Sequence, residues 1–381
     1  MQKLGLGTLV GSLVLVSSSV AAEIDLISNL KLSGDARVRA ISTSGIDSTS
    51  SKANEVFDSR IRLNIDTQTQ DGIKLHTRIL FDNNNWGNNN VNTANDDDNF
   101  SWDEASILLP VGDFFLYAGR INDTYGTKFY GSNGDKLDLA FFGYTGIKDT
   151  LLYAFDYKVV ESNSNNSNGG FFSTGDNDVD AYSIGGQTTI DKLLVGGRYA
   201  LIEAAPAVDY SFVDAFVTGE VAGLELEAQV QKNFGDSDAF GAYLNVGKQL
   251  DDLRVGLVAL TTKDGYVAGG DLQASYLTDS DSGIDSLGRE GSFGDTTTFA
   301  AQAKYNVSPK MTLEGIVAYH SIDDSTMGGI NADQDVIEYN LGLSYQLKKS
   351  ATLNLRYAGA DLDNGTLEDV NNFMAGLEIK F

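Results

Sequence analysis

The 381-residue sequence contains no cysteine, only three prolines and few basic residues. The absence of cysteine excludes a disulfide framework and a thiolate metal site. No apolar run reaches the ~18 residues that a helical membrane span requires. Only 27 Lys and Arg stand against 53 Asp and Glu, and the resulting formal charge of −26 argues against nucleic acid as a partner.

The N-terminal residues have the three parts of a secretory signal peptide. Met1-Gln2-Lys3 is basic, Leu4 to Val16 is apolar, and Ser17 to Ala22 supplies small residues for cleavage. We expect cleavage before Glu23, so that residues 1–22 are the signal and residues 23–381 form one domain. An uncleaved membrane anchor is the alternative. Apolar residues make up 42% of the chain and recur regularly, which argues against disorder.

The end of the chain alternates between apolar and mostly polar residues, and a strand places such residues on opposite faces. One face would carry Phe373, Ala375, Leu377, Ile379 and Phe381, and the other Met374, Gly376, Glu378 and Lys380. In a soluble sandwich the polar face meets water, whereas in a membrane barrel the apolar face meets lipid. The signal peptide, the aromatic end and the number of strands favour an all-β fold, a transmembrane antiparallel up-and-down β-barrel.

The same alternation recurs about eighteen times, with sixteen strands as the alternative. Candidate strands lie near residues 30–39, 60–66, 73–82, 102–109, 114–122, 136–145, 150–160, 179–190, 193–203, 210–220, 224–233, 239–249, 253–263, 296–307, 311–322, 336–347, 351–362 and 371–381. A barrel of sixteen or more strands encloses an aqueous channel.

The connections between these strands alternate in length. Short turns are expected at 70–72, 110–113, 146–149, 191–192, 221–223, 250–252, 308–310 and 348–350, and mostly longer loops lie between them. Short periplasmic turns and long extracellular loops are typical of outer-membrane barrels, so we expect both termini in the periplasm. Pro110, Pro206 and Pro309 all fall in connections, as their exclusion from a paired ladder requires.

The stretch from Tyr117 to Ala140, which contains Gly119-Arg120, resembles the third-loop hairpin of trimeric Gram-negative porins. Among porins, the chain is most similar to the major outer-membrane porin of the Campylobacter group, whose barrel has eighteen strands. The resemblance implies a homotrimer in the bacterial outer membrane and a third loop that folds inward and narrows the pore. The terminal Phe381 likewise resembles the signature that the barrel-assembly machinery recognises. The Pro-Glu-Phe-Gly-Gly motif of enterobacterial porins is absent, so their detailed constriction is not transferred.

Charged residues on the first strands and in this third loop are the candidates for a pore constriction. Acids of an infolded loop facing a basic wall would create a transverse field across the narrowing. The loop would contribute Asp123, Lys128 and Asp135, and the wall Arg37, Arg39, Arg60, Arg62, Lys74, Arg78 and Arg120, with Lys31 on the same face. Alternatively, the basic residues solvate a polar lumen and pair with Asp35, Asp66 and Asp138.

No cofactor and no catalytic site are expected. His76 and His320 stand apart without a hydrolase or zinc-protease motif, and lumen-facing histidines are the simpler interpretation. Asp96-Asp97-Asp98 suits a solvated loop tip, or alternatively a calcium ion that bridges to lipopolysaccharide phosphates. The run from Asp279 to Glu290 only partly matches a calcium loop, because Gly283 replaces an expected Asp or Asn.

The function expected from these features is passive diffusion of ions and small hydrophilic solutes through a porin in contact with lipid and lipopolysaccharide. Weak cation selectivity is expected because the chain is acidic and because Asp123 and Asp135 would lie at the narrowest point. A substrate-selective channel of the same fold is the alternative. An outer-membrane enzyme and an adhesin anchored by its barrel are two further ones.

Overall fold

The computed structural model describes residues 27–44, 54–86, 101–122, 126–129, 136–160, 179–204, 210–235, 238–269, 272, 274–278, 282, 284, 291, 295–323, 334–362 and 369–381. The expected signal peptide, Asp96 to Asp98, Asp123 and Asp135 lie outside these residues. Within them, no helix has the length and apolar character that a bilayer crossing demands.

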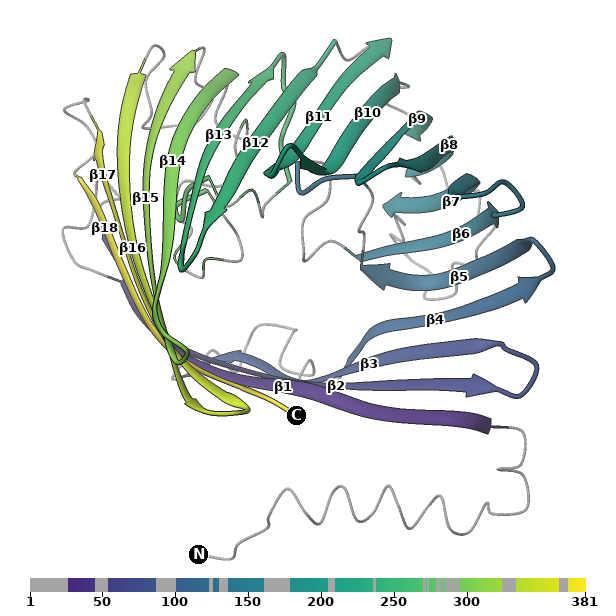
Figure 1. Cartoon of the computed structure of the whole chain (residues 1–381), viewed down its shortest axis with the longest axis horizontal. Coiled ribbons are helices and arrows are strands. Elements are labelled where there is room, and N and C mark those ends of the chain that lie inside the picture. Colours follow the sequence, from purple (N-terminus) through teal and green to yellow (C-terminus); the bar gives the residue numbers. More distant parts are fainter. Residues whose placement is uncertain are drawn as a thin grey trace, which may run out of the picture.

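The described residues form one closed antiparallel barrel of eighteen strands. The strands are β1 (Ile27–Thr43), β2 (Asn54–Thr69), β3 (Lys74–Asn85), β4 (Ser101–Val111), β5 (Phe114–Asn122), β6 (Lys136–Tyr144), β7 (Thr150–Val160), β8 (Val179–Ile190), β9 (Leu193–Ala204), β10 (Tyr210–Val221), β11 (Leu224–Gly235), β12 (Phe240–Leu250), β13 (Leu253–Lys263), β14 (Asp295–Ser308), β15 (Met311–Asp323), β16 (Gln334–Lys348), β17 (Ala351–Leu362) and β18 (Val370–Lys380). Each strand pairs with the next, and β18 returns to pair with β1, so the sheet has no free edge (Figure 1). The prediction of eighteen strands is confirmed, and the alternative of sixteen is excluded.

All eight short turns lie within two residues of their predicted positions, but Pro110, expected in a connection, is paired with Phe115 near the end of β4. Several contain a residue with left-handed backbone angles, such as Asp191 (φ 54°), Asp251 (φ 49°) and the pair Ala222 (φ 51°) and Gly223 (φ 77°). Tight hairpin turns need positive φ because it matches the twist of the flanking strands, and Asp and Gly adopt it at low cost. The turn chemistry therefore sets the registers of these hairpins.

The two faces of most strands differ as expected for a membrane barrel. On β16, the outward-facing Ile337 and Leu341 are 54% and 64% exposed, whereas the inward-facing Glu338 and Asn340 are buried. On β18, Phe373 points outward and Met374 points inward, which confirms the predicted faces of the last strand. The outer surface is consequently an apolar belt.

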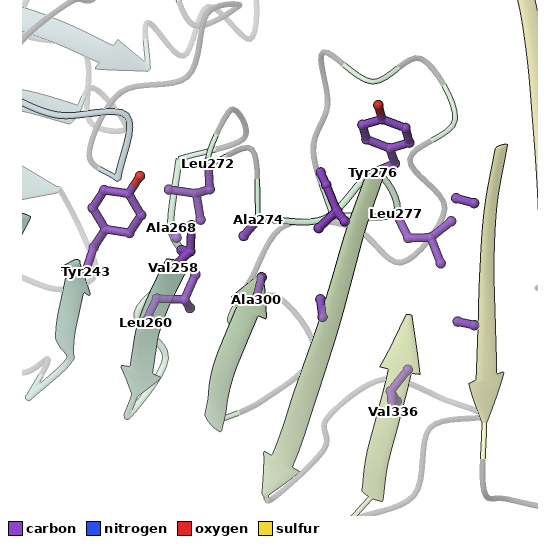
Figure 2. Packing of buried hydrophobic residues seen from close by; sticks show 14 of the residues in the cluster. Tyr243, Val258, Leu260, Ala268, Leu272, Ala274, Tyr276, Leu277, Ala300 and Val336 are labelled. Atoms are coloured by element: carbon purple, nitrogen blue, oxygen red, sulfur yellow. The ribbon is translucent and has the colours of Figure 1, made fainter. Parts of the chain in front are cut away.

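The lumen is partly filled by segments that connect the strands. Residues 126–129, between β5 and β6, and the described residues between β13 and β14 pack against the inner wall. A hydrophobic cluster joins Leu272, Ala274, Tyr276 and Leu277 of the second segment to strand residues such as Val336 (Figure 2). The inner wall is therefore a packing surface as well as the lining of a channel.

Candidate functional site

Arginines from the first three strands form one basic wall of the lumen. The register places Arg37 of β1 directly opposite Arg60 of β2, and Asp35 opposite Arg62. Arg78 of β3 and Arg39 of β1 complete the group, which lies on the inner face as the sequence predicts. The register therefore concentrates positive charge on this wall. Like charges directly opposite each other on neighbouring strands repel, so the wall needs counter-charges.

Four of these five arginines have close carboxylate partners. Arg39 donates from Nε to both oxygens of Asp58 at 2.9 and 3.0 Å. Asp35 accepts from Arg62 Nε at 2.9 Å and from Arg60 at 3.2 Å. Arg78 binds Asp103 at 2.5 Å and also pairs with Glu104.

Arg37 is the least neutralised member of the wall. Its terminal nitrogen lies 4.0 Å from Asp58, an oxygen that Arg39 already binds. The buried Nε atoms of Arg37 and of Arg60 have no hydrogen-bond partner among the described residues. The sequence suggested that basic residues pair with Asp35, and Arg60 and Arg62 do so. Positive charge nevertheless remains in excess at Arg37.

The arginine wall lines a cavity of about 660 Å³ inside the barrel. Among the described residues, its lining contains eight basic side chains and two acidic ones, Glu314 and Glu378. The basic side chains are Arg37, Arg39, Arg60, Arg62, Arg78, Arg254, Lys304 and Arg356. Asp35, Asp58, Asp103 and Glu104, which are not part of the lining, bind four of these arginines, so the excess of positive charge at the cavity is smaller than the count of side chains indicates.

The third loop folds into the lumen in its described residues 126–129, as the resemblance to trimeric porins implies. Thr127 donates from its backbone nitrogen and its hydroxyl to Oε1 of Gln229 on β11, at 2.9 and 2.7 Å. Gly126 has a φ of +73°, and a Cβ there would lie 2.9 Å from the same oxygen, so glycine permits this close approach. Phe129 stacks between Tyr243 and Tyr266.

Lys128 lies on this infolded segment, and its backbone nitrogen donates to Glu227 at 3.3 Å. β11 stands nine strands from β2 in the ring, so the loop is fastened to the wall that faces the arginines. Because Asp123 and Asp135 lie outside the described residues, the loop acids of the predicted constriction stay a prediction.

The described residues between β13 and β14 form a second infolded segment, which faces the arginine wall. The sequence predicts a long extracellular loop there. The carboxylate of Glu338 on β16 accepts hydrogen bonds from the backbone nitrogens of Tyr276 and Leu277, at 2.9 and 3.1 Å, and from the hydroxyl of Ser275. Asn372 of β18 donates to the carbonyl oxygen of Ile284 at 2.8 Å.

Tyr276 and Ser282 of this segment border the cavity itself. The hydroxyl of Tyr276 donates to Glu314 at 2.5 Å, and the guanidinium of Arg356 lies 5.3 Å from its ring centre. Glu338 lies on the inner face, and its neighbours in the sequence, Ile337 and Tyr339, lie on the outer face. Its place in this alternation is the only sequence signal that could have identified it as a lumen-facing residue. Asp279, Asp281, Asp285 and Glu290, which suggested calcium, lie outside the described residues.

One predicted constriction residue lies on the wrong face. Arg120 shares its side of β5 with the exposed Phe114 and Leu116, so it points away from the lumen. It binds Asp138, at 3.0 and 2.8 Å, on the outer surface. Its charge suggests the inner face, but both faces of 114–121 are largely apolar, so the alternation of residues there gives no direction.

Lys74 does face the lumen, but it lines a separate cavity of about 400 Å³ together with Lys31, His76 and Tyr117. His76 bridges Asp66 and Glu104, with contacts of 2.7 and 3.0 Å. His320 is buried on the inner face, where it contacts Thr298 at 2.9 Å. Both histidines therefore face inward, as the sequence predicts, and Lys74 belongs to a neighbouring basic site.

An aromatic section of the inner wall was not expected from the sequence. A cavity of about 260 Å³ follows β5 to β9 and is lined by Phe115, Tyr117, Ile121, Leu137, Leu139, Phe141, Leu151, Tyr153, Phe155, Gln187 and Arg198. Phe141 stacks with Tyr153 and Phe155 at ring distances of 5.3 and 5.7 Å. The rule that polar residues face the lumen thus fails on this side of the barrel.

No protein-family model matches the sequence, and no curated protein matches it. Solved structures of Pseudomonas outer-membrane porins do match the fold. Pseudomonas aeruginosa OpdQ is 14% identical, with 94% of this chain and 99% of that chain covered and a TM-score of 0.63. P. aeruginosa OccK2, in complex with glucuronate, is 13% identical, with 93% and 99% covered and a TM-score of 0.65.

A BenF-like porin from Pseudomonas fluorescens Pf-5 is 9% identical, with 93% of this chain and 100% of that chain covered and a TM-score of 0.62. At these identities the likeness establishes the fold. The chain has the fold of a Gram-negative outer-membrane porin. The narrower resemblance to the Campylobacter-type porin is not among these structural neighbours and stays a prediction.

Proposed function

We propose that this chain is an outer-membrane channel through which ions and small hydrophilic solutes diffuse passively, without chemistry. The observation that carries the proposal is the cavity of about 660 Å³ inside a closed barrel, with charged walls and an apolar outer belt. An apolar exterior suits lipid, and a charged interior suits hydrated solutes. The bacterial outer membrane is the location that this fold and the signal-like N-terminus support.

We further propose that the cavity beside the arginine wall favours anions. Its lining has eight basic and two acidic side chains, and Arg37 has only a distant counter-charge. The cation selectivity predicted from the sequence rests on total charge and on Asp123 and Asp135. At a narrow point the local charge outweighs the total charge because the walls focus the field there. The described arginine wall therefore opposes the cation preference that the loop acids would produce.

A substrate-selective channel is the second candidate function. Two observations favour it. The lumen combines the arginine wall with the aromatic section of the inner wall along β5 to β9, and the structural neighbour OccK2 was solved with glucuronate. A carboxylate solute would place its charge against the arginines. A binding site of this kind would make the flow of such a solute saturable.

Reversal potentials across a salt gradient, measured on single channels of refolded protein, test the proposed function. We expect conducting channels with a preference for chloride over potassium. Absence of conductance would contradict the channel itself, and a potassium preference would contradict the role of the arginine wall. Block of the ion current by millimolar glucuronate, without block by neutral glucose, would favour the substrate-selective candidate.

A further inference from the structure

A row of charged residues crosses the outer face of the barrel, where an apolar surface is expected. The pairing register aligns Arg120 of β5 with Asp138 of β6, Asp138 with Lys158 of β7, and Lys158 with Asp180 of β8. The signs alternate along these four strands. Arg120 and Asp138 form an ion pair at 2.8 Å, and Lys158 and Asp180 form another at 2.6 Å.

The exposed apolar residues on the same strands show that this row points outward. Arg120 has the parity of Leu116, and Asp138 has the parity of Phe142, which are 42% and 50% exposed. The inner face behind the row is apolar, with Leu139 and Tyr157 buried against their neighbours. At the level of this row, the inner face is therefore apolar and the outer face charged, the reverse of the usual polarity of a membrane barrel.

The Arg120–Asp138 pair lies within the height that lipid would cover. Phe114 and Tyr144, whose rings are 4.7 Å apart, mark the turn end of β5 and β6, and each charged residue is six positions beyond its aromatic. Six residues of a tilted strand rise ~15 Å along the barrel axis, whereas the apolar band of such barrels is ~25 Å tall. At the matching position on β14, six residues beyond Tyr305, stands the exposed Phe299.

Two half-exposed charges at this depth are unfavourable against hydrocarbon, so another polar surface must cover them. The side chains of Arg120 and Asp138 are 50% and 41% exposed, which leaves donors and acceptors available beyond their own pair. β5 and β6 have nine residues each, against seventeen in β1. The covering surface would thus meet the part of the wall where the strands are short.

We propose that the outer face of β5 and β6, centred on Arg120 and Asp138, is where a second copy of this chain packs. Copies that share one membrane orientation are related by a rotation axis parallel to the barrel axis. Around an axis beside the β5–β6 boundary, Arg120 faces Asp138 of the partner subunit, and Asp138 faces Arg120 of the partner subunit. The charge pattern is self-complementary for a twofold and for a threefold axis, because the β5 side of each copy meets the β6 side of the next.

The outward residues next to the pair permit close approach. Ala118 and Ala140 lie directly opposite each other on β5 and β6, two positions from Arg120 and Asp138. Small side chains let neighbouring backbones approach in a membrane, where packing drives association. The interface would then combine a tight contact at the alanines with paired charges above it.

Disulfide cross-linking of the full-length protein tests the contact directly, because the chain contains no native cysteine. Ala118→Cys places a thiol beside the proposed axis, within reach of the same thiol in the second copy, and Ala301→Cys is the matched control. Ala301 is an exposed outward-facing residue of β14, nine strands away and, like Ala118, four positions from an aromatic near a turn. In outer membranes treated with a mild oxidant, we expect covalent dimers for Ala118→Cys and monomers for Ala301→Cys.

Charge reversal provides the second test, read as the mass of the unheated protein in detergent. Arg120→Glu would set acid against acid at the contact, so we expect loss of the oligomer, while the same reversal at the exposed turn residue Lys192 leaves it intact. Ala118→Cys variants that remain monomeric, or that cross-link no better than Ala301→Cys, would overturn the proposal. So would a wild-type monomer whose row instead binds purified lipopolysaccharide in an Arg120-dependent manner. If Arg120→Glu does not fold, the comparison of Ala118→Cys with Ala301→Cys still tests the proposed contact.

Discussion

Gly34 of β1 and Phe381, the final residue, close the barrel by exchanging two backbone hydrogen bonds. The nitrogen of Gly34 donates to the oxygen of Phe381 at 2.7 Å, and the nitrogen of Phe381 donates back at 3.0 Å. A Cβ on Gly34 would lie 2.7 Å from Cζ of Phe381, so the aromatic ring covers the bare backbone of the glycine. The side chain of Phe381 thus packs over the seam, which is the junction where β18 pairs with β1.

The seam predicts that Phe381→Ala will reduce the yield of folded, membrane-inserted protein severalfold. The substitution removes the ring from the seam and also removes the terminal aromatic proposed as the signal for the assembly machinery. Phe373→Ala is the control, because Phe373 is an outward-facing phenylalanine of the same strand with similar exposure, 47% against 52%. Heat-modifiable mobility of outer-membrane fractions measures the yield, and equal yields for both variants would remove the special role of Phe381.

The arginine wall predicts that Arg37→Gln combined with Arg62→Gln will shift selectivity towards cations. Two positive charges leave the lining, while Asp35 and Asp58 remain on the same wall. The shift should be largest at low ionic strength, because the screening length falls from ~30 Å at 0.01 M to ~3 Å at 1 M. Reversal potentials measure it. Arg120→Gln removes the same kind of charge from the outer face and should leave the potential unchanged; a comparable shift there would contradict the assignment of faces.

The proposed loop acids predict the opposite response. Asp123→Asn combined with Asp135→Asn should move the channel towards anions if these residues reach the lumen beside residues 126–129. The same reversal-potential measurement applies, with Asp149→Asn in an exposed turn as the control. No shift in the double variant would place both aspartates away from the narrow part of the pore.

Glu338 predicts a gain in conductance when its carboxylate is removed. In Glu338→Ala, the backbone nitrogens of Tyr276 and Leu277 lose their acceptor, which weakens docking of the segment by about 3 kcal/mol. The segment would then leave the wall more often, and single-channel traces should show larger and noisier currents. Asn340→Ala changes a buried, inward-facing residue two positions along β16 and should keep wild-type currents. Matching traces from both variants would contradict the role of Glu338.

The number of strands and their hairpins follow from local features of the sequence. Alternation with period two marks each strand, and Asp and Gly residues suited to positive φ mark turns such as Asp191-Lys192 and Ala222-Gly223. Both are properties of a few neighbouring residues, so they can be read without the rest of the chain. The lumen-facing positions of Arg37, Arg60 and Arg78 follow in the same way, because charged and apolar residues alternate clearly on those strands.

Tertiary structure alone decided which face β5 presents and that the segment between β13 and β14 enters the lumen. Alternation carries no direction where both faces are apolar, so the neighbouring strands had to place Arg120 outside beside Asp138. The infolded segments are held by Gln229 and Glu338, which lie 102 and 62 positions from Thr127 and Tyr276 in the sequence. Such contacts depend on where the barrel brings distant strands, and no local pattern of residues encodes that position.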